Sequence, residues 1–241
     1  MTSPGRREPK MRQETVQRRE EILKAALQTF GAKGYNKAPL TEIAEQVDMT
    51  HAGILHHFGS KDRLLLEVLS YRDKTDVAHL DGQHIPDGIE LFRHLVRTAM
   101  LNSRRAGIVQ AYAVLSAESV TDGHPARDFF DARYRTLRAE VRRAFELVCE
   151  QHGVADRSRV DDAAAAILAV MDGLQVQWLL SPADVDLARA TEFAIRSIVS
   201  GVLSPQPSPL DEPETGTRDA REPFVSLGDS MNPLPTPAPV E

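Results

Sequence analysis

Helical periodicity runs through almost the whole chain and constrains its fold more than any other feature. Between Gln13 and Leu203, apolar residues recur at helical spacing, and no stretch alternates in the manner of a half-buried strand. Breaks that contain Gly or Pro divide this region into about nine segments of helix length. The sequence therefore predicts an all-α protein of about nine helices without a β-sheet.

The two ends of the chain differ from this helical region. Residues 204–241 carry nine of the 15 prolines, and 7 Asp/Glu against 2 Lys/Arg. Such a segment buries too little apolar surface to offset its ordering entropy, so we predict a disordered, acidic, Pro-rich tail over residues 204–241. Residues 1–14 are rich in Arg and Lys and contain no apolar stretch. They predict a flexible basic arm and no signal peptide.

The net charge of −6 is unevenly distributed. Residues 1–74 carry 13 Lys/Arg against 10 Asp/Glu, whereas residues 75–203 carry 14 against 18. Positive charge at one end is expected when a single segment meets a polyanion. The charge pattern directs any nucleic-acid contact to the first 74 residues, without establishing one.

Signs of catalysis or metal binding are absent from the sequence. Cys149 is the only cysteine, which excludes an intrachain disulfide and a Cys-based zinc site. His51 and His56 miss the i, i+4 spacing that aligns two ligands on a helix, and no carboxylate completes a zinc motif. Gly-rich phosphate loops and nucleophile elbows are also missing. We expect no catalytic residues, no metal and no cofactor.

The apolar runs are short. The longest, residues 163–171, spans nine residues, which is too short to cross a bilayer. We therefore expect a cytoplasmic protein with no membrane partner.

Residues 40–58 are the most informative segment. Ile43 and Ala44 mark the inner face of a short helix over residues 42–47, and Thr41 is placed to cap it. After a polar turn, Thr50 is placed to cap a second short helix. Two such helices are typical of a helix-turn-helix, whose second helix enters the major groove. Plain core packing is the alternative for this pattern alone.

A longer set of motifs extends over residues 18–69. The set consists of Phe30, Gly34-Tyr35, Thr41-x-Ile43-Ala44, Leu55-x-His57-Phe58 and Ser60-Lys61-Asp62-x-Leu64. Together these motifs resemble the DNA-binding domain of the TetR family of bacterial transcriptional regulators. The resemblance implies a homodimer that presents two recognition helices to a near-palindromic operator in double-stranded DNA. It also implies a three-helix DNA-binding domain at residues 15–60 and a helical regulatory and dimerisation domain at residues 61–203.

Two positions depart from the family's pattern. Asp48 stands where the turn usually has Gly, and Asp tolerates the left-handed conformation better than most residues, so we expect the turn to survive. Leu55 stands where the family often has a Tyr that touches a phosphate. His56 is the candidate replacement.

The predicted DNA contacts follow from helix ends and exposed polar groups. Helix N-termini present free N–H groups and partial positive charge, which suits a phosphate. Lys61 resembles the family's phosphate-contacting lysine, with a solvated surface charge as the alternative. The side chain of His51 can donate to or accept from a base edge, and Ala52 can contact a thymine methyl. The predicted DNA-binding set is Lys37, Thr41, Thr50, His51, Ala52, Gly53, Leu55, His56 and Lys61.

The last two predicted helices carry apolar stripes. The stripes consist of Ile167, Met171, Leu174 and Trp178, and of Leu187, Ala190, Ala194 and Ile198. Stripes of this kind are more often core than interface, but the family resemblance implies dimerisation through these helices. Gly173 lies mid-helix, where it is expected to permit close approach of another helix.

The resemblance also implies a small-molecule effector bound between the central helices. Candidate lining residues combine bulk with polar tips and are Tyr112, Phe129, Arg133, Met171, Gln175 and Trp178. A core or surface role is the alternative for each. We therefore expect a sequence-specific transcriptional regulator, a repressor released from its operator by a small molecule. The alternative is an activator or a ligand-independent architectural DNA-binding protein.

Overall fold

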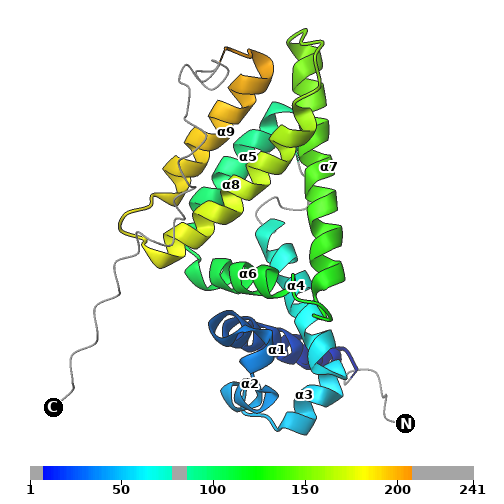
Figure 1. Ribbon diagram of the computed structural model, residues 1–241. Coiled ribbons are helices and arrows are strands. Elements are labelled where there is room, and N and C mark those ends of the chain that lie inside the picture. Colours follow the sequence, from blue (N-terminus) through cyan, green and yellow to red (C-terminus); the bar gives the residue numbers. More distant parts are fainter. Residues whose placement is uncertain (1–7, 78–85, 208–241) are drawn as a thin grey trace, which may run out of the picture. The chain divides into compact units, whose positions relative to one another are not determined.

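The computed structural model describes residues 8–77 and 86–207, and this part of the chain forms nine α-helices and no strand (Figure 1). The prediction of an all-α fold is confirmed. The helices are α1 (Glu8–Lys37), α2 (Leu40–Gln46), α3 (His51–Phe58), α4 (Lys61–Val77), α5 (Ile89–Asn102), α6 (Ala106–Glu118), α7 (Arg127–Gln151), α8 (Val160–Leu180) and α9 (Leu187–Leu203).

The first hydrophobic core joins the four N-terminal helices to α6 and the start of α7. Phe30, Ile43, Ile54 and Leu65 are fully buried in it, together with Leu115 from α6. Helix α1 packs along α6, as Figure 1 shows. Residues on both sides of the predicted domain boundary at residue 60 therefore share one core.

Gly31 permits the close approach of α1 to α6. A Cβ atom at this position would lie 3.0 Å from Cα of Ala111, so any larger residue would push the two helices apart. The main part of α1 ends three residues later at Gly34, whose φ of 74° and ψ of 171° are not helical. Gly34 thus ends the main part of the helix, whereas Gly31 lies inside it.

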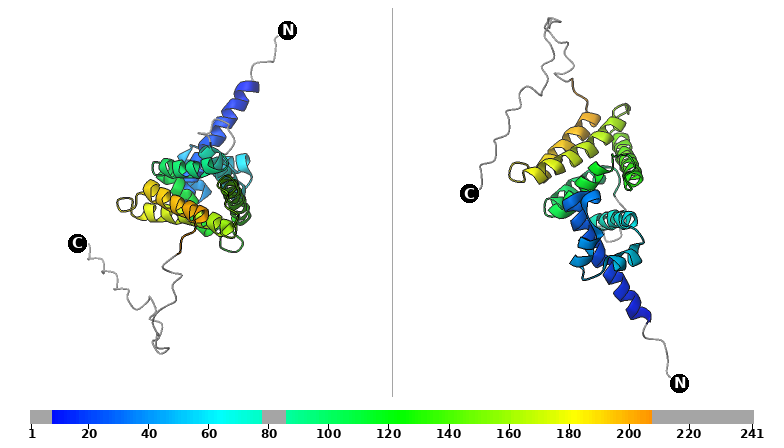
Figure 2. Two further views of the ribbon diagram at one scale, coloured as in Figure 1. Left: turned by 90° about the horizontal axis from the view of Figure 1, so that it is seen from above. Right: turned by 60° about the horizontal axis from the view of Figure 1, so that its bottom comes forward.

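A second core is enclosed by α5, α7, α8 and α9. Phe92, Phe145, Ile167 and Ile195 form its centre. Helices α8 and α9 lie side by side in both views of Figure 2. Within the described ranges, only α8 is long and apolar enough to cross a membrane, but one face of it is buried in this core.

The structure confirms two of the three predictions made for the turn and caps of the helix-turn-helix. Oγ1 of Thr50 accepts a hydrogen bond from the backbone N–H of Gly53 at 3.1 Å, which confirms the predicted cap of α3. Asp48 adopts the predicted left-handed conformation, with φ of 49°. The predicted cap at Thr41 is wrong, because α2 begins at Leu40, two residues earlier than predicted, and its N-cap position is Pro39.

The last helix, α9, begins at a side-chain cap. Asp186 caps α9 by accepting a hydrogen bond from the backbone N–H of Arg189 at 3.0 Å. Residues 181–186 form a turn, so Pro182 lies before the helix and not in its first turn. A side-chain cap four residues after the proline decides the boundary.

The two predicted irregular ends lie largely outside the described residues. The basic arm is described from Glu8 onward, where the chain is already helical. Residues 8–14 are mostly Glu, Lys, Met, Arg and Gln, which favour helix over coil. The Pro-rich tail is described only as far as Pro207.

Candidate nucleic-acid interface and ligand cavity

Helix α3 buries one side and exposes the other. Ile54 and Phe58 are buried against the first core, with exposed fractions of 1% and 3%. His51, Ala52 and His56 are exposed on the opposite side. The α3 surface therefore presents two imidazoles and a methyl group, which suit base edges and thymine methyls in a major groove.

The other predicted DNA-contacting residues differ in their exposure. Thr41, Thr50 and Lys37 are exposed, whereas Gly53 and Leu55 are half-buried. His56 is the more accessible candidate for a phosphate contact.

Lys61 lies at the first turn of α4 and is held by an aromatic ring. Its Nζ lies 4.6 Å from the ring centroid of Tyr35. Burial lowers the pKa of Lys61, although the neighbouring Asp62 and Glu118 oppose the shift. Tyr35 in turn donates its hydroxyl to Asp62, and its backbone N–H donates to Oε2 of Glu118 at 2.7 Å. The lysine is thus fixed in position rather than freely solvated.

Arg19 holds the C-terminal end of α3, and sequence reasoning missed it. Its guanidinium donates to the backbone carbonyl of His57 and forms an ion pair with Glu67 on α4. The same group lies 4.3 Å from the ring centroid of Phe58. Because this one side chain of α1 contacts both α3 and α4, it helps to fix the orientation of α3. Nothing local in the sequence indicates a contact over this separation.

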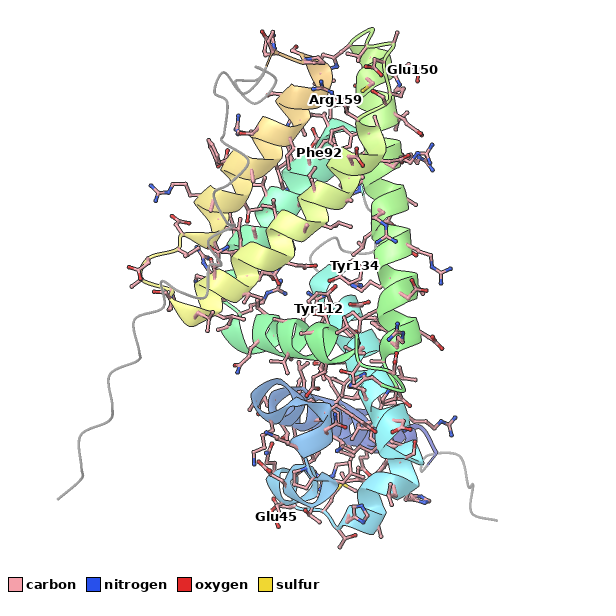
Figure 3. The ribbon with its side chains drawn as sticks, in the orientation of Figure 1. Glu45, Phe92, Tyr112, Tyr134, Glu150 and Arg159 are labelled. Carbon is pink, nitrogen blue, oxygen red and sulfur yellow. The ribbon has the colours of Figure 1, made fainter. Side chains whose placement is uncertain are left out.

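A cavity of about 570 Å³ lies among α4 to α8. Five of the six predicted lining residues surround it: Tyr112, Phe129, Arg133, Met171 and Gln175. Tyr112 and Tyr134 are labelled in Figure 3, where they occupy the space between α6, α7 and α8. Trp178 lies outside the lining and packs instead with Val109 and Leu187.

A polar network crosses the cavity wall and joins α4 to α6 and α7. Asp73 on α4 accepts from Arg72 at 3.2 Å and also from Arg133 on α7. Nε of Arg133 donates to the hydroxyl of Tyr112 at 3.3 Å, and the Arg72 guanidinium lies 4.2 Å from the Tyr112 ring centroid. Burial raises the pKa of the Tyr112 hydroxyl, so it stays protonated at neutral pH.

A second polar pair lines the same cavity. The Tyr134 hydroxyl donates to Oδ2 of Asp172 at 2.5 Å. Burial raises the pKa of Asp172, although the Tyr134 hydrogen bond and the charges of Arg72 and Arg133 oppose the shift. Burial and the hydrogen bond to Asp172 both raise the pKa of Tyr134.

Two known families match this chain over consecutive segments. Residues 22–68 match the family described as bacterial regulatory proteins, tetR family. Residues 91–202 match the family described as BetI-type transcriptional repressor, C-terminal. Together the matches cover well over half of the chain. The chain belongs to the TetR family.

Full-length relatives agree with this assignment. The HTH-type transcriptional repressor BepR of Brucella suis biovar 1 is 26% identical over 215 residues, which cover 80% of this chain and 95% of BepR. Salmonella enterica GusR shares the fold with a TM-score of 0.60 and 22% identity, over 78% of this chain and 96% of GusR. A SmeT–triclosan complex has a TM-score of 0.60 and 18% identity, over 81% and 98% of the chains.

Membership of the TetR family establishes the class of activity. The relatives are DNA-binding transcriptional repressors, and proteins of the family bind small-molecule ligands. This TetR chain is accordingly a transcriptional regulator and not an enzyme. In the part of the chain that the structure describes, no group of three or more His, Cys, Asp or Glu is arranged to hold a metal ion.

The outer face of α8 and α9 in this TetR chain carries apolar residues that the sequence analysis missed. Val176 and Leu180 on α8 are 46% and 81% exposed, and Phe193 on α9 is 73% exposed. The stripe of Ile167, Met171 and Trp178 is instead buried inside the subunit. Apolar residues on more than one side of α8 were the available signal, because a helix of this kind is covered on several sides.

Proposed function

We propose that the protein is a cytoplasmic, homodimeric repressor that binds a near-palindromic operator through α3 and dissociates when a small molecule enters the cavity. One arrangement carries this proposal: α4 begins next to the exposed recognition helix α3 and ends at a ligand-sized cavity. Helix α4 begins at Lys61 and brings Arg72, Asp73 and Lys74 to the cavity wall. A ligand that prefers the state with lower DNA affinity would release the operator.

The DNA-binding part of the proposal assigns different roles to the exposed residues. His51 and Ala52 would contact base edges, with Gly53 and Leu55 beside them. Lys61, Lys37 and His56 would contact phosphates, together with the N-terminal turns at Thr41 and Thr50. Exposure of His51, Ala52 and His56 on α3 supports this division, as does exposure of Lys37, Thr41 and Thr50.

Operator selection from random DNA followed by fluorescence anisotropy tests these roles. We expect Lys61→Ala to weaken binding to all sequences alike and to lower the salt slope by about one unit. His51→Ala is expected to change the preferred sequence instead. Lys24→Ala is the control, because Lys24 is exposed on α1 and pairs with Glu20. Wild-type operator binding by both variants would contradict the assignment.

The proposed dimer forms through the outer face of α8 and α9. Val176, Leu180 and Phe193 are large apolar groups exposed on this face. Gly173 has no atom within 4 Å of a Cβ built on it, so its predicted helix contact is not made inside the subunit. A second subunit would supply that contact and would cover the three apolar side chains.

Sedimentation velocity tests the dimer. We expect Phe193→Glu to convert the protein to a monomer, because it places a charge at the centre of the interface. Val120→Glu is the control, since Val120 is 76% exposed on the α6–α7 connection. A dimer that survives Phe193→Glu together with Leu180→Glu would contradict this interface.

The competing function is a regulator that needs no small molecule. The cavity favours the ligand-responsive function, because its volume and mixed lining are typical of small-molecule sites. Screening a metabolite library for release of labelled operator distinguishes the two. We expect release by at least one compound, and release should be lost when Met171→Trp fills the cavity. A complete absence of releasing compounds would favour the ligand-independent regulator.

A further inference from the structure

The α8 wall of the cavity presents a buried acceptor without a donor. Leu168, Met171, Asp172 and Gln175 line the cavity from one face of α8. Gln175 is only 7% exposed, and its Oε1 has no hydrogen-bond partner in the described part of the chain. Because a buried acceptor loses its hydration, an unpaired carbonyl of this kind favours a ligand that donates to it.

A carboxylate stands one helical turn before this acceptor. Asp172 shares the α8 face with Gln175 at i, i+3 spacing, and its Oδ2 accepts from Tyr134 at 2.5 Å. The charges of Arg72 and Arg133 also act on this carboxylate. The two side chains together form a pair of acceptors, one of which carries negative charge.

The two arginines of the cavity already share an acidic partner. Asp73 accepts from both Arg72 and Arg133, and Arg133 also donates to Tyr112. An incoming anion would have to displace Asp73 to reach either guanidinium. The lining as a whole is balanced, since Lys74 and Glu140 add one charge of each sign. A ligand therefore reaches the acceptors of α8 more readily than these two guanidinium groups.

The rest of the lining suits a positive head group on an apolar body. Tyr112, Phe129 and Tyr134 contribute aromatic rings, whose faces attract cations. Leucines from three helices complete the wall: Leu91, Leu95, Leu137 and Leu168. A cavity of about 570 Å³ holds a compact organic molecule.

We infer that the effector is an amphipathic amine, protonated at neutral pH, whose N–H groups donate to Oε1 of Gln175 and to the Asp172 carboxylate. Its apolar body would lie against the leucines of α5 and α7. A quaternary ammonium ion supplies charge but no N–H, so it leaves the Gln175 carbonyl unpaired. A carboxylate ligand places like charge beside Asp172. The inference rests on the proposed ligand-responsive function and specifies its ligand.

Isothermal titration calorimetry on the full-length protein, without DNA, tests the ligand class. The probes are matched compounds on two apolar bodies, adamantyl and naphthylmethyl, each as primary amine, trimethylammonium, alcohol and carboxylate. We expect the amine to bind about tenfold more tightly than the trimethylammonium and alcohol compounds, and the carboxylate to bind weakest.

Variants of the two acceptors link the preference to these residues. Gln175→Met keeps the side-chain size and removes the acceptor, and it should weaken amine binding about tenfold while leaving alcohol binding within about twofold. Asp172→Asn should weaken amine binding by about tenfold or more. Gln175→Glu keeps an acceptor and should bind the amine at least as tightly as wild type. Gln110→Met and Asp128→Asn are exposed controls, and thermal unfolding verifies that every variant is folded.

Three outcomes overturn the inference: no amine binds, the alcohol or carboxylate binds more tightly than the amine, or both acceptor variants retain wild-type amine affinity. Failure of the proposed function is distinguished by adding operator DNA. An amine that binds with the expected preference but never releases the operator supports the ligand class and contradicts release. Release by anionic or neutral compounds alone supports the proposed function and overturns the inference.

Discussion

The DNA-binding helices and the cavity wall use buried residues in opposite ways. Around α2 and α3, Ile43, Ala44 and Ile54 are at most 1% exposed, and the first core surrounds them on all sides. Around the cavity, Gln175 is almost as buried but faces open space, and its carbonyl has no donor. The first region is closed by its own side chains, whereas the second leaves a cavity among five helices.

The contrast shows how one chain combines rigidity with responsiveness. A closely packed helix-turn-helix holds α3 in one orientation, because cores of this density resist small displacements. The cavity wall lacks such packing on one side, so its conformation depends on what fills it. Helix α4 takes part in both regions, through Leu64 and Leu65 in the core and through Arg72 and Asp73 at the cavity.

The largest expected effect comes from removing a ring from the closed core. Phe30→Ala should lower the free energy of unfolding by about 3–5 kcal/mol, because the ring is fully buried and leaves a void. Phe129→Ala in the cavity wall should cost only about 1–2 kcal/mol, since its half-buried ring already borders open space. Urea denaturation followed by circular dichroism measures both. Equal losses would remove the distinction between the two regions.

A smaller loss is expected where α1 meets α6. Gly34→Ala should cost about 1–3 kcal/mol, because φ of 74° with ψ of 171° strains any residue with a Cβ. The added atom would also lie 2.0 Å from Oε1 of Glu118, which accepts from Tyr35 through its other oxygen. Gly107→Ala on α6 is the control, since nothing lies within 4 Å of its added Cβ, and it should lose nothing. Thermal unfolding of both variants decides the matter.

A variant of Arg19 tests whether contacts among the DNA-binding helices also fix the orientation of α3. Arg19→Gln should weaken operator binding about tenfold, because the His57 carbonyl and Phe58 ring lose the group that holds them. The salt slope should stay unchanged, which separates a positioning role from a phosphate contact. Arg18→Gln is the neighbouring control, since Arg18 pairs only with Glu21 on its own helix. A reduced slope for Arg19→Gln would indicate direct contact with DNA.

The smallest expected effect is a pH dependence at the cavity. Burial raises the pKa of Asp172 in the folded protein, so the folded state holds that proton more tightly than the unfolded chain. Stability from this group is therefore lost as pH rises from about 4 toward 7. The melting temperature of Asp172→Asn relative to wild type should increase over the same range. Asp128→Asn, at an exposed position, should show no such trend.

Much of the DNA-binding region follows from the sequence, because its determinants are local. The spacing of Ile43 and Ala44, the cap at Thr50 and the left-handed turn at Asp48 all act within a few residues. The cap at Thr41 fails because α2 begins at Leu40, two residues earlier than predicted, which makes Pro39 the N-cap position. Arg19 escapes prediction because its partner His57 lies 38 residues away in sequence.

The cavity is less predictable, because its lining comes from five helices. The combination of bulk and polar tips predicted Tyr112, Arg133 and Gln175 as lining residues, and the structure brings them together around one cavity. Trp178 has the same character but packs against Val109 and Leu187. The exposed apolar face of α8 and α9 was also missed, since periodicity alone gives the same pattern for a core and for an interface.

The tight contact between Gly31 and Ala111 bears on how operator specificity can be reprogrammed. A hybrid joined at residue 60 would carry a foreign α1 against this protein's own α6, where 3.0 Å separates an added Cβ from the neighbouring backbone. Grafting residues 40–58 alone replaces both short helices while α1, α6 and their shared surface stay native. Exchange of the shorter segment should therefore transfer operator specificity and leave the response to a ligand unchanged.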